Sequence, residues 1–220
     1  MKVSILKKPY RVDAAPQLPL ARLLFRDVRL SWLWLPLRLY IGYVWLSAGL
    51  TKLTGYSFSL DAPVKPAPGG AWVFNAHTGD ALRHFLLGAL QKAGGEHASV
   101  QGWYAALLHG FVLPQAEIFT YLVTFGEVLV GLGLIFGCFT GLAALFGLFM
   151  NLNYLFAGTI SINPTLAIAA VLLILAWRVA GYLGGDRILL PLLLPRIGLD
   201  KIPQSGWRAR EHKLAWADRS

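Results

Sequence analysis

Long apolar runs dominate this chain, and four of them are long enough to cross a lipid bilayer as helices. A hydrocarbon core of about 30 Å needs roughly 20 mostly apolar residues in helical conformation. Residues 32–50, 118–136, 139–157 and 164–183 meet that length, and each run contains at most one charged side chain. We therefore expect an all-α fold, namely an integral membrane four-helix bundle.

The segments between the runs predict how the helices are arranged. Residues 137–138 join the second run to the third and residues 158–163 join the third to the fourth, so these three helices must be antiparallel neighbours. The first two runs are separated by a long loop, residues 51–117. A further apolar run, residues 188–195, is too short to span and contains two prolines, so we expect it at the membrane interface.

Amphipathic segments flank the first run on both sides. Residues 18–30 mix leucine and phenylalanine with arginines at helical spacing, which predicts a helix on the cytoplasmic membrane surface. In the long loop, residues 81–90 and 99–112 each place large apolar side chains on one helical face, and we expect both to lie over the bundle as a lid. The residues concerned are Arg22, Arg26 and Arg29, then Leu82, Phe85, Leu86 and Leu90, and finally Trp103, Leu107 and Phe111.

The distribution of charge predicts the orientation of the chain. A net charge of +9 over 220 residues would suggest nucleic acid if it were spread evenly. Instead, residues 1–31 carry seven Lys and Arg against two Asp, residues 178–220 carry eight against four acids, and residues 51–117 carry four of each. This pattern favours the plasma (inner) membrane without a nucleic acid partner. Both termini are then cytoplasmic. The chain forms a single membrane domain with a cytoplasmic lead, residues 1–31, and a basic cytoplasmic tail, residues 184–220.

The remaining composition excludes several classes of chemistry. The chain is 56% apolar and 14% charged, which is unlike an ordinary soluble enzyme. Cys138 is the single cysteine, so the chain cannot form an internal disulfide, a four-cysteine zinc site or a cycling thiol pair. All five histidines lie outside the predicted spans, so none of the spans offers an axial haem histidine. We expect no bound metal.

Ionisable groups inside the spans are candidate functional residues, because a charge in hydrocarbon costs several kcal/mol unless it is paired or solvated. Counting about 1.5 Å per residue from the cytoplasmic face places Arg38 roughly 10 Å deep and Glu127 roughly 14 Å deep. The two could therefore meet near the middle of the bundle. Such a pair would be either catalytic or a device that only sets helix registry.

Helical spacing places further polar groups on the faces that carry these two residues, together with glycines that are typical of close helix packing in lipid. They are Trp45 and Lys52 in the first span, Thr124 in the second, and Asn151 and Tyr154 in the third. The set predicts a polar pocket that opens outward beneath the lid, with Trp45 and Trp103 in its aromatic wall. Such a pocket suits a small anion or a quinone head group, and Glu127 is a carboxyl able to carry protons.

Motifs in the first, second and fourth predicted spans, and one residue at the start of the third, resemble the DoxX/DoxD family of small four-span membrane proteins. They are RLYIGYVWLSAGLTK from Arg38 to Lys52, GEVLVGLGLIFG from Gly126, the following Thr140, Asn163-Pro164, and GYLGGDRILLP from Gly181. The long loop is more similar to the extended DoxD-type form, the membrane subunit of thiosulfate:quinone oxidoreductase. Gly185 departs from the pattern, where leucine is expected before Asp186.

The resemblance implies a quinone-linked oxidoreductase component that acts on a small sulfur anion such as thiosulfate. Quinone would be the electron acceptor, and a second subunit or redox partner protein would accompany the chain. On this hypothesis Lys52 and Arg38 attract the anion or a quinone oxygen and Glu127 relays protons. Asn151 and Tyr154 orient the ligand. A non-catalytic membrane scaffold for a soluble redox enzyme and a small-solute permease are the alternatives.

Overall fold

The computed structural model describes residues 19–94 and 97–193, and this part of the chain is mostly helical. Its strands are β1 (Tyr56–Ser57) and β2 (Lys65–Pro66), which form one short antiparallel pair in the loop after the first long helix. The all-α expectation is therefore confirmed. Residues 1–18 of the predicted lead and residues 194–220 of the predicted tail lie outside the described residues.

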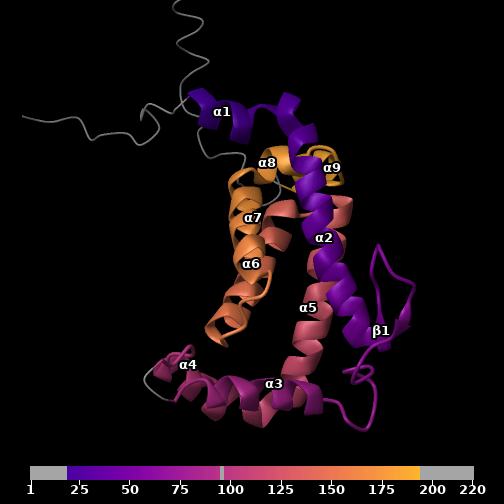
Figure 1. The fold of residues 1–220 in the computed structure, drawn as a ribbon. Coiled ribbons are helices and arrows are strands. Elements are labelled where there is room, and N and C mark those ends of the chain that lie inside the picture. The colour runs from indigo at the N-terminus through magenta and orange to yellow at the C-terminus, as the bar shows by residue number, and fades with distance from the viewer. Residues whose placement is uncertain (1–18, 95–96, 194–220) are drawn as a thin grey trace, which may run out of the picture.

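Four helices lie beside one another along a common direction in Figure 1, and we call this group the bundle; that all four cross a membrane stays a prediction. They are α2 (Ser31–Thr54), α5 (Ala116–Phe136), α6 (Thr140–Phe156) and α7 (Asn163–Leu175). The turn between α5 and α6 is tight because Gly137 and Phe139 both adopt left-handed backbone conformations, with φ of 64° and 52°. Ile41, Leu134 and Leu173 lie fully buried where the helices meet.

Close packing of α2 on α5 depends on glycine. A Cβ atom added at Gly131 would lie 2.5 Å from the backbone nitrogen of Leu46, and one added at Gly42 would lie 3.0 Å from the backbone nitrogen of Ile135. The backbones therefore approach more closely than any larger residue would permit. This confirms that the glycine-bearing faces predicted from the sequence are packing faces.

The fourth apolar run is not one continuous helix. The helix α7 ends at Leu175, α8 (Trp177–Ala180) follows, and the chain then turns into α9 (Asp186–Leu193). Within the described residues, one continuous helical segment, Gly102–Phe136, is long and apolar enough to cross a membrane by length and composition. Thr140–Phe156 and Asn163–Leu175 are shorter apolar helices, so the number of membrane spans stays a prediction.

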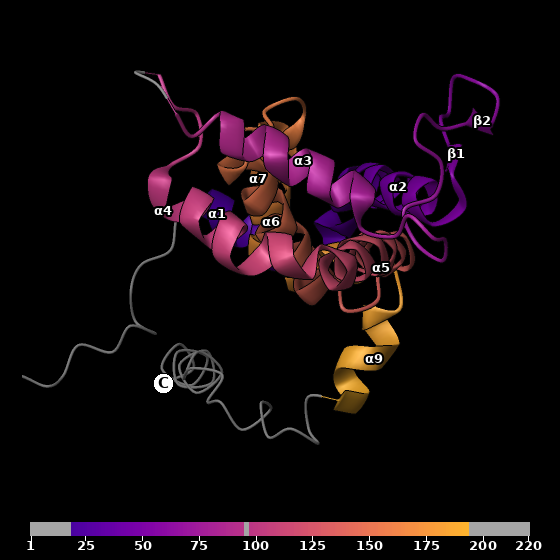
Figure 2. The same cartoon turned by 90° about the horizontal axis from the view of Figure 1, so that it is seen from below.

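The long loop forms the two expected helices, which lie across one end of the bundle in Figures 1 and 2. They are α3 (Asp80–Gln91) and α4 (Gly102–Leu107), and α4 continues through a π-helical turn (Leu108–Val112) and a 3-10 turn (Leu113–Gln115) into α5. We call residues 80–115 the lid and this end of the bundle the lid end. The lid has its own apolar core around Leu86, Val100 and Leu108.

The buried face of the second lid helix differs from the predicted one. Trp103, Leu107 and Phe111 are exposed, at 58%, 42% and 52%, whereas Tyr104 and Leu108 point inward. The hydroxyl of Tyr104 donates to the backbone oxygen of Asn153 at 3.1 Å and lies 3.0 Å from its Oδ1. A buried tyrosine turns its hydroxyl towards a hydrogen-bond partner, and this sets the rotation of the helix.

The other end of the bundle carries α1 (Pro19–Arg26), a 3-10 turn (Val28–Leu30), α8 and α9 (Figure 1). Leu24 and Phe25 of α1 pack against the bundle core, where the ring centroids of Phe25 and Trp34 lie 5.6 Å apart. The indole nitrogen of Trp34 donates to the backbone oxygen of Leu24 at 3.0 Å. The amphipathic helix expected before the first run is thus present, and we call this end the arginine end for reasons given below.

Candidate functional site

Three helices each contribute one polar side chain to a hydrogen-bonded group at the lid end. The ammonium of Lys52 on α2 lies 2.6 Å from Oε2 of Glu127 on α5, and the phenol of Tyr154 on α6 donates to Oε1 of Glu127 at 2.7 Å. The side chain of Glu127 is 2% exposed and that of Lys52 is 15% exposed. We call these three residues the carboxylate site.

The approach of α2 to α5 brings Lys52 within reach of Glu127. A Cβ atom added at Gly49 would lie 2.7 Å from the backbone nitrogen of Val128 and 3.0 Å from Cβ of Glu127. Because Gly49 precedes Lys52 by three residues, both lie on the same face of α2. The glycine therefore lets the lysine reach the carboxylate.

Aromatic rings enclose the carboxylate site. Trp45 stacks on Tyr154 with ring centroids 6.4 Å apart, and Phe85 of the lid meets Tyr154 edge to face at 6.1 Å. The ammonium of Lys52 lies 5.0 Å from the ring centroid of Trp72. This cation–π contact places an aromatic ring beside the lysine ammonium. Electrostatic interactions are stronger in such surroundings than in water.

An ordered turn in the loop before α3 positions Trp72. The backbone nitrogen of Trp72 donates to the backbone oxygen of Lys52 at 2.7 Å. The side-chain amide of Asn75 donates to the backbone oxygens of Ala71 at 2.8 Å and Val73 at 3.3 Å. Val73 itself is buried. The tryptophan is therefore held on Lys52 by the backbone as well as by its ring.

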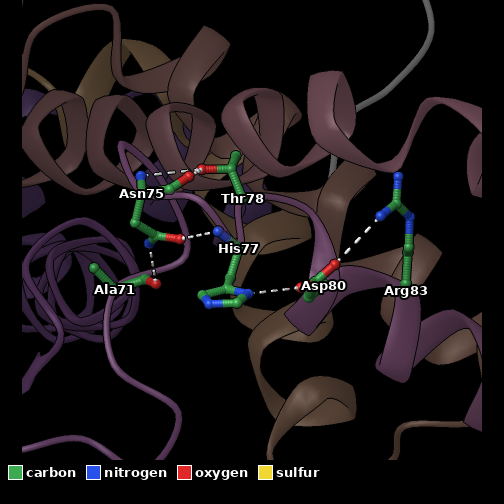
Figure 3. Close-up of polar contacts among 6 residues, drawn as sticks. All are labelled: Ala71, Asn75, His77, Thr78, Asp80 and Arg83. Atoms are coloured by element: carbon green, nitrogen blue, oxygen red, sulfur yellow. Dashed lines mark hydrogen bonds and ion pairs between the residues drawn. The ribbon is translucent and has the colours of Figure 1, made fainter.

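The same turn continues into the first residues of α3, as Figure 3 shows. Oδ1 of Asn75 accepts from the backbone nitrogen of His77 at 2.8 Å, and Nδ1 of His77 lies 3.3 Å from Oδ2 of Asp80. Arg83 donates to Oδ1 of Asp80 at 3.2 Å. Since His77 is 86% exposed at its side chain, these contacts order the surface of the loop and are not a buried catalytic group.

Within the described part of the chain, two buried polar atoms near the carboxylate site have no hydrogen-bond partner. They are Oγ1 of Thr124 and Oδ1 of Asn151. Thr124 lies one helical turn from Glu127 on α5, and Asn151 lies one turn from Tyr154 on α6, where its Nδ2 donates to the backbone oxygen of Asn163 at 2.7 Å. Buried polar atoms usually have a protein, water or ligand partner. These two oxygen atoms are therefore available for a hydrogen bond to a water or a ligand.

The structure does not pair Arg38 with Glu127. The guanidinium of Arg38 donates to the backbone oxygens of Ala180 at 2.8 Å and Leu183 at 3.1 Å, at the arginine end. Depth counting from the sequence was wrong because it began both helices at the same level. In the structure Gly42 packs against Ile135, so the first turns of α2 extend past the end of α5. Arg38 therefore lies beyond the last turn of α5.

Asp186 is a structural residue that sequence reasoning noted only as part of a motif. Its carboxylate accepts from the backbone nitrogens of Phe139 at 2.6 Å and Thr140 at 2.9 Å, which caps the start of α6. The backbone nitrogens of Gly185 and Asp186 donate to the α5–α6 turn. Together with Arg38, this residue holds the α8–α9 segment against the bundle.

The predicted site residues thus fall into three groups. The first group meets at the carboxylate site and consists of Lys52, Glu127, Tyr154 and Trp45. The second lies one helical turn from that site and consists of Thr124 and Asn151. The third lies apart from it, with Arg38 at the arginine end and Trp103 on the lid. The ring of Trp103 contacts Tyr104 and Phe156, and its Nε1 donates to Gln101 at 2.6 Å. Trp72 and Phe85 were missed as site residues. Trp72 lies in a loop that has no periodic signal, and the amphipathic pattern that placed Phe85 on the lid does not record which residue of the bundle it contacts.

Among the described residues, no group of three or more His, Cys, Asp and Glu side chains is arranged to hold a metal ion. No curated protein and no solved structure matched the chain. The family model named DoxX matches residues 33–159. That stretch begins in α2, includes the whole of the carboxylate site and the lid, and covers more than half of the chain. The chain is therefore a member of the DoxX family of membrane proteins.

Proposed function

We propose that this chain is a multi-pass membrane component of a quinone-linked oxidoreductase that acts on a small sulfur anion such as thiosulfate. The observation that carries the proposal is the buried contact of the Glu127 carboxylate with both Lys52 and Tyr154. An ionisable group at membrane depth is costly and is by default functional.

The residues at the carboxylate site suit a quinone head group. A lysine ammonium has three N–H donors, and one of those of Lys52 is directed to Glu127, so donors remain for a ligand oxygen. The hydroxyl of Thr124, which has no partner among the described residues, is a further donor, and Trp45 supplies an aromatic wall. When bound, the quinone would accept two electrons.

The protein side of such a reaction is proton transfer and charge stabilisation. Oxidation of two thiosulfate ions to one tetrathionate, with a sulfur–sulfur bond formed, releases two electrons, and reduction of a quinone to a quinol takes up these two electrons and two protons. Glu127 holds and passes protons, and Tyr154 fixes the carboxylate by hydrogen bonding to Oε1. Lys52 attracts the anion or orients the ligand oxygen from the accessible side.

We propose four spans formed by α2, α5, α6 and the α7–α8 pair, with both termini in the cytoplasm. Large apolar side chains that face away from the bundle support this arrangement, since lipid would cover them. Examples are Leu122, Leu129, Phe149 and Ile168, which are 60%, 67%, 64% and 65% exposed. The proposal includes a second subunit or redox partner protein, as in the DoxD-type enzymes that the sequence resembles.

The test is thiosulfate-dependent reduction of decylubiquinone by the chain and its co-purifying partners in nanodiscs. Glu127→Gln should abolish turnover while the protein remains folded. Glu117→Gln is the matched control, because Glu117 is an exposed glutamate on the same helix. Equal quinone reduction in the wild type and both variants would support the scaffold alternative instead. Solute flux without quinone would support the permease.

A further inference from the structure

The two ends of the bundle differ in accessible charge. Among the described side chains at the arginine end, four arginines are exposed and a single acid, Asp27, is partly exposed. The arginines are Arg26, Arg29, Arg178 and Arg187. Asp186, the other described acid there, is 2% exposed and caps α6. This end therefore presents a net positive surface.

The lid end is balanced by comparison. Its accessible lysines and arginines, apart from Lys52, are Lys65, Arg83 and Lys92, and its accessible acids among the described residues are Asp61, Asp80 and Glu117. Arg83 is already paired with Asp80. The asymmetry is thus a property of the folded surface and not only of the terminal segments. A positive surface that is confined to one end favours a negatively charged partner that contacts only that end.

Exposed apolar side chains accompany the arginines. On α1, Leu20 is 65% and Leu23 is 46% exposed, although Leu24 and Phe25 of the same helix pack against the bundle. Trp32, at the start of α2, is 62% exposed. A short helix that lies across a bundle end, with arginine beside outward-facing leucine, is typical of contact with the boundary between lipid headgroups and acyl chains.

The same combination recurs on the second short helix at this end. On α9, Ile188 is 66% and Leu192 is 58% exposed, next to exposed Arg187. The guanidinium of Arg187 lies 5.3 Å from the ring centroid of Tyr182, and that of Arg178 lies 4.9 Å from the ring centroid of Trp177. Aromatic rings beside cations at a helix end are characteristic of the membrane–water interface.

We propose that the arginine end binds the headgroups of acidic phospholipids. The ligand is an anionic lipid in the leaflet that surrounds the arginine end. Guanidinium groups bind its phosphate, and the neighbouring apolar side chains contact its acyl chains. A soluble anion would satisfy the arginines and leave Leu20, Trp32 and Ile188 in water. The proposal is independent of the carboxylate site and of any redox activity.

The experiment measures phosphatidylglycerol binding to the purified full-length chain by native mass spectrometry, with phosphatidylcholine as the neutral reference. The triple variant Arg26→Gln, Arg29→Gln, Arg187→Gln should bind phosphatidylglycerol roughly 100-fold more weakly, since each basic side chain near an anionic surface contributes on the order of a factor of five. The matched control is Lys65→Gln, Arg83→Gln, Lys92→Gln, which removes three cations from the lid end and should leave the affinity within about twofold.

Single variants keep the test decisive if the triple variant does not fold. Arg26→Gln and Arg187→Gln should each weaken phosphatidylglycerol binding about fivefold, and higher salt should reduce binding by the wild type. Wild-type affinity in the folded triple variant would overturn the proposal. Equal binding of phosphatidylglycerol and phosphatidylcholine by the wild type, or an equal loss in the lid-end control, would overturn it as well.

Discussion

Lys52 and Glu127 form an ion pair that is accessible from the lysine side. The two charged groups are 2.6 Å apart, yet the side chain of the lysine is 15% exposed and that of the glutamate is 2% exposed. A ligand that reaches the pair from outside therefore meets the ammonium, which lies beside the ring of Trp72, before the carboxylate. The buried carboxylate is in turn fixed from behind by Tyr154.

Removal of Lys52 alone should destabilise the protein strongly. Lys52→Met leaves the Glu127 charge buried without its cation, which we expect to lower the free energy of unfolding by about 3–5 kcal/mol. Lys52→Met combined with Glu127→Met should recover part of this loss, because apolar residues of similar volume replace both charges while the hydroxyl of Tyr154 loses its acceptor. Unfolding in detergent measures the effect. Lys65→Met, at an exposed site, is the control, and an equal loss there would refute the explanation.

Gly131 should tolerate no side chain. Gly131→Ala places Cβ 2.5 Å from the backbone nitrogen of Leu46, so α2 and α5 must separate, and we expect a loss of about 1–3 kcal/mol. Gly88→Ala is the matched control, because Gly88 is also helical and a Cβ there meets nothing within 4 Å. It should be neutral or slightly stabilising. Thermal unfolding of both variants decides the matter, and similar midpoints would contradict the packing argument.

Arg38 should act in stability and not in substrate binding. Its two terminal nitrogens donate to two different backbone oxygens, and the single ammonium of Arg38→Lys cannot reproduce this fork. We expect Arg38→Lys to cost about 1–3 kcal/mol of stability. Arg178→Lys, an exposed change at the same end, should have little effect. A folded Arg38→Lys protein with wild-type stability but altered ligand affinity would contradict this assignment.

The lone cysteine permits a direct test of membrane orientation. Cys138 lies in the α5–α6 turn at the arginine end, and Ser59 lies exposed in the loop at the lid end. In intact cells, an impermeant maleimide should label a Cys138→Ser, Ser59→Cys protein and should leave the wild type unlabelled until the membrane is permeabilised. Labelling in the reverse order would place the arginine end outside.

Local patterns in the sequence predicted the elements well. The apolar runs marked α2, α5 and α6, and helical spacing placed Lys52, Glu127 and Tyr154 on faces that do meet. Both lid helices and α1 were also recognisable from their amphipathic pattern. These features depend on local periodicity, which a single sequence records directly.

Relations between elements could not be predicted in the same way. The sequence does not record how far α2 extends past α5, and this offset decides that Glu127 meets Lys52 and not Arg38. The rotation of α4 depends on the partner that Tyr104 finds on α6, so the inward face was assigned wrongly. The position of Trp72 on Lys52 depends on a loop without periodicity.

Quinone binding to a folded protein without the ion pair tests the claim that Lys52 and Glu127 form part of a ligand site and do more than join two helices. The Lys52→Met, Glu127→Met variant should keep its fold, and its affinity for decylubiquinone, measured by quenching of tryptophan fluorescence in nanodiscs, should fall at least about tenfold because charge-assisted hydrogen bonds are lost. Unchanged quinone affinity in that folded variant would contradict the claim.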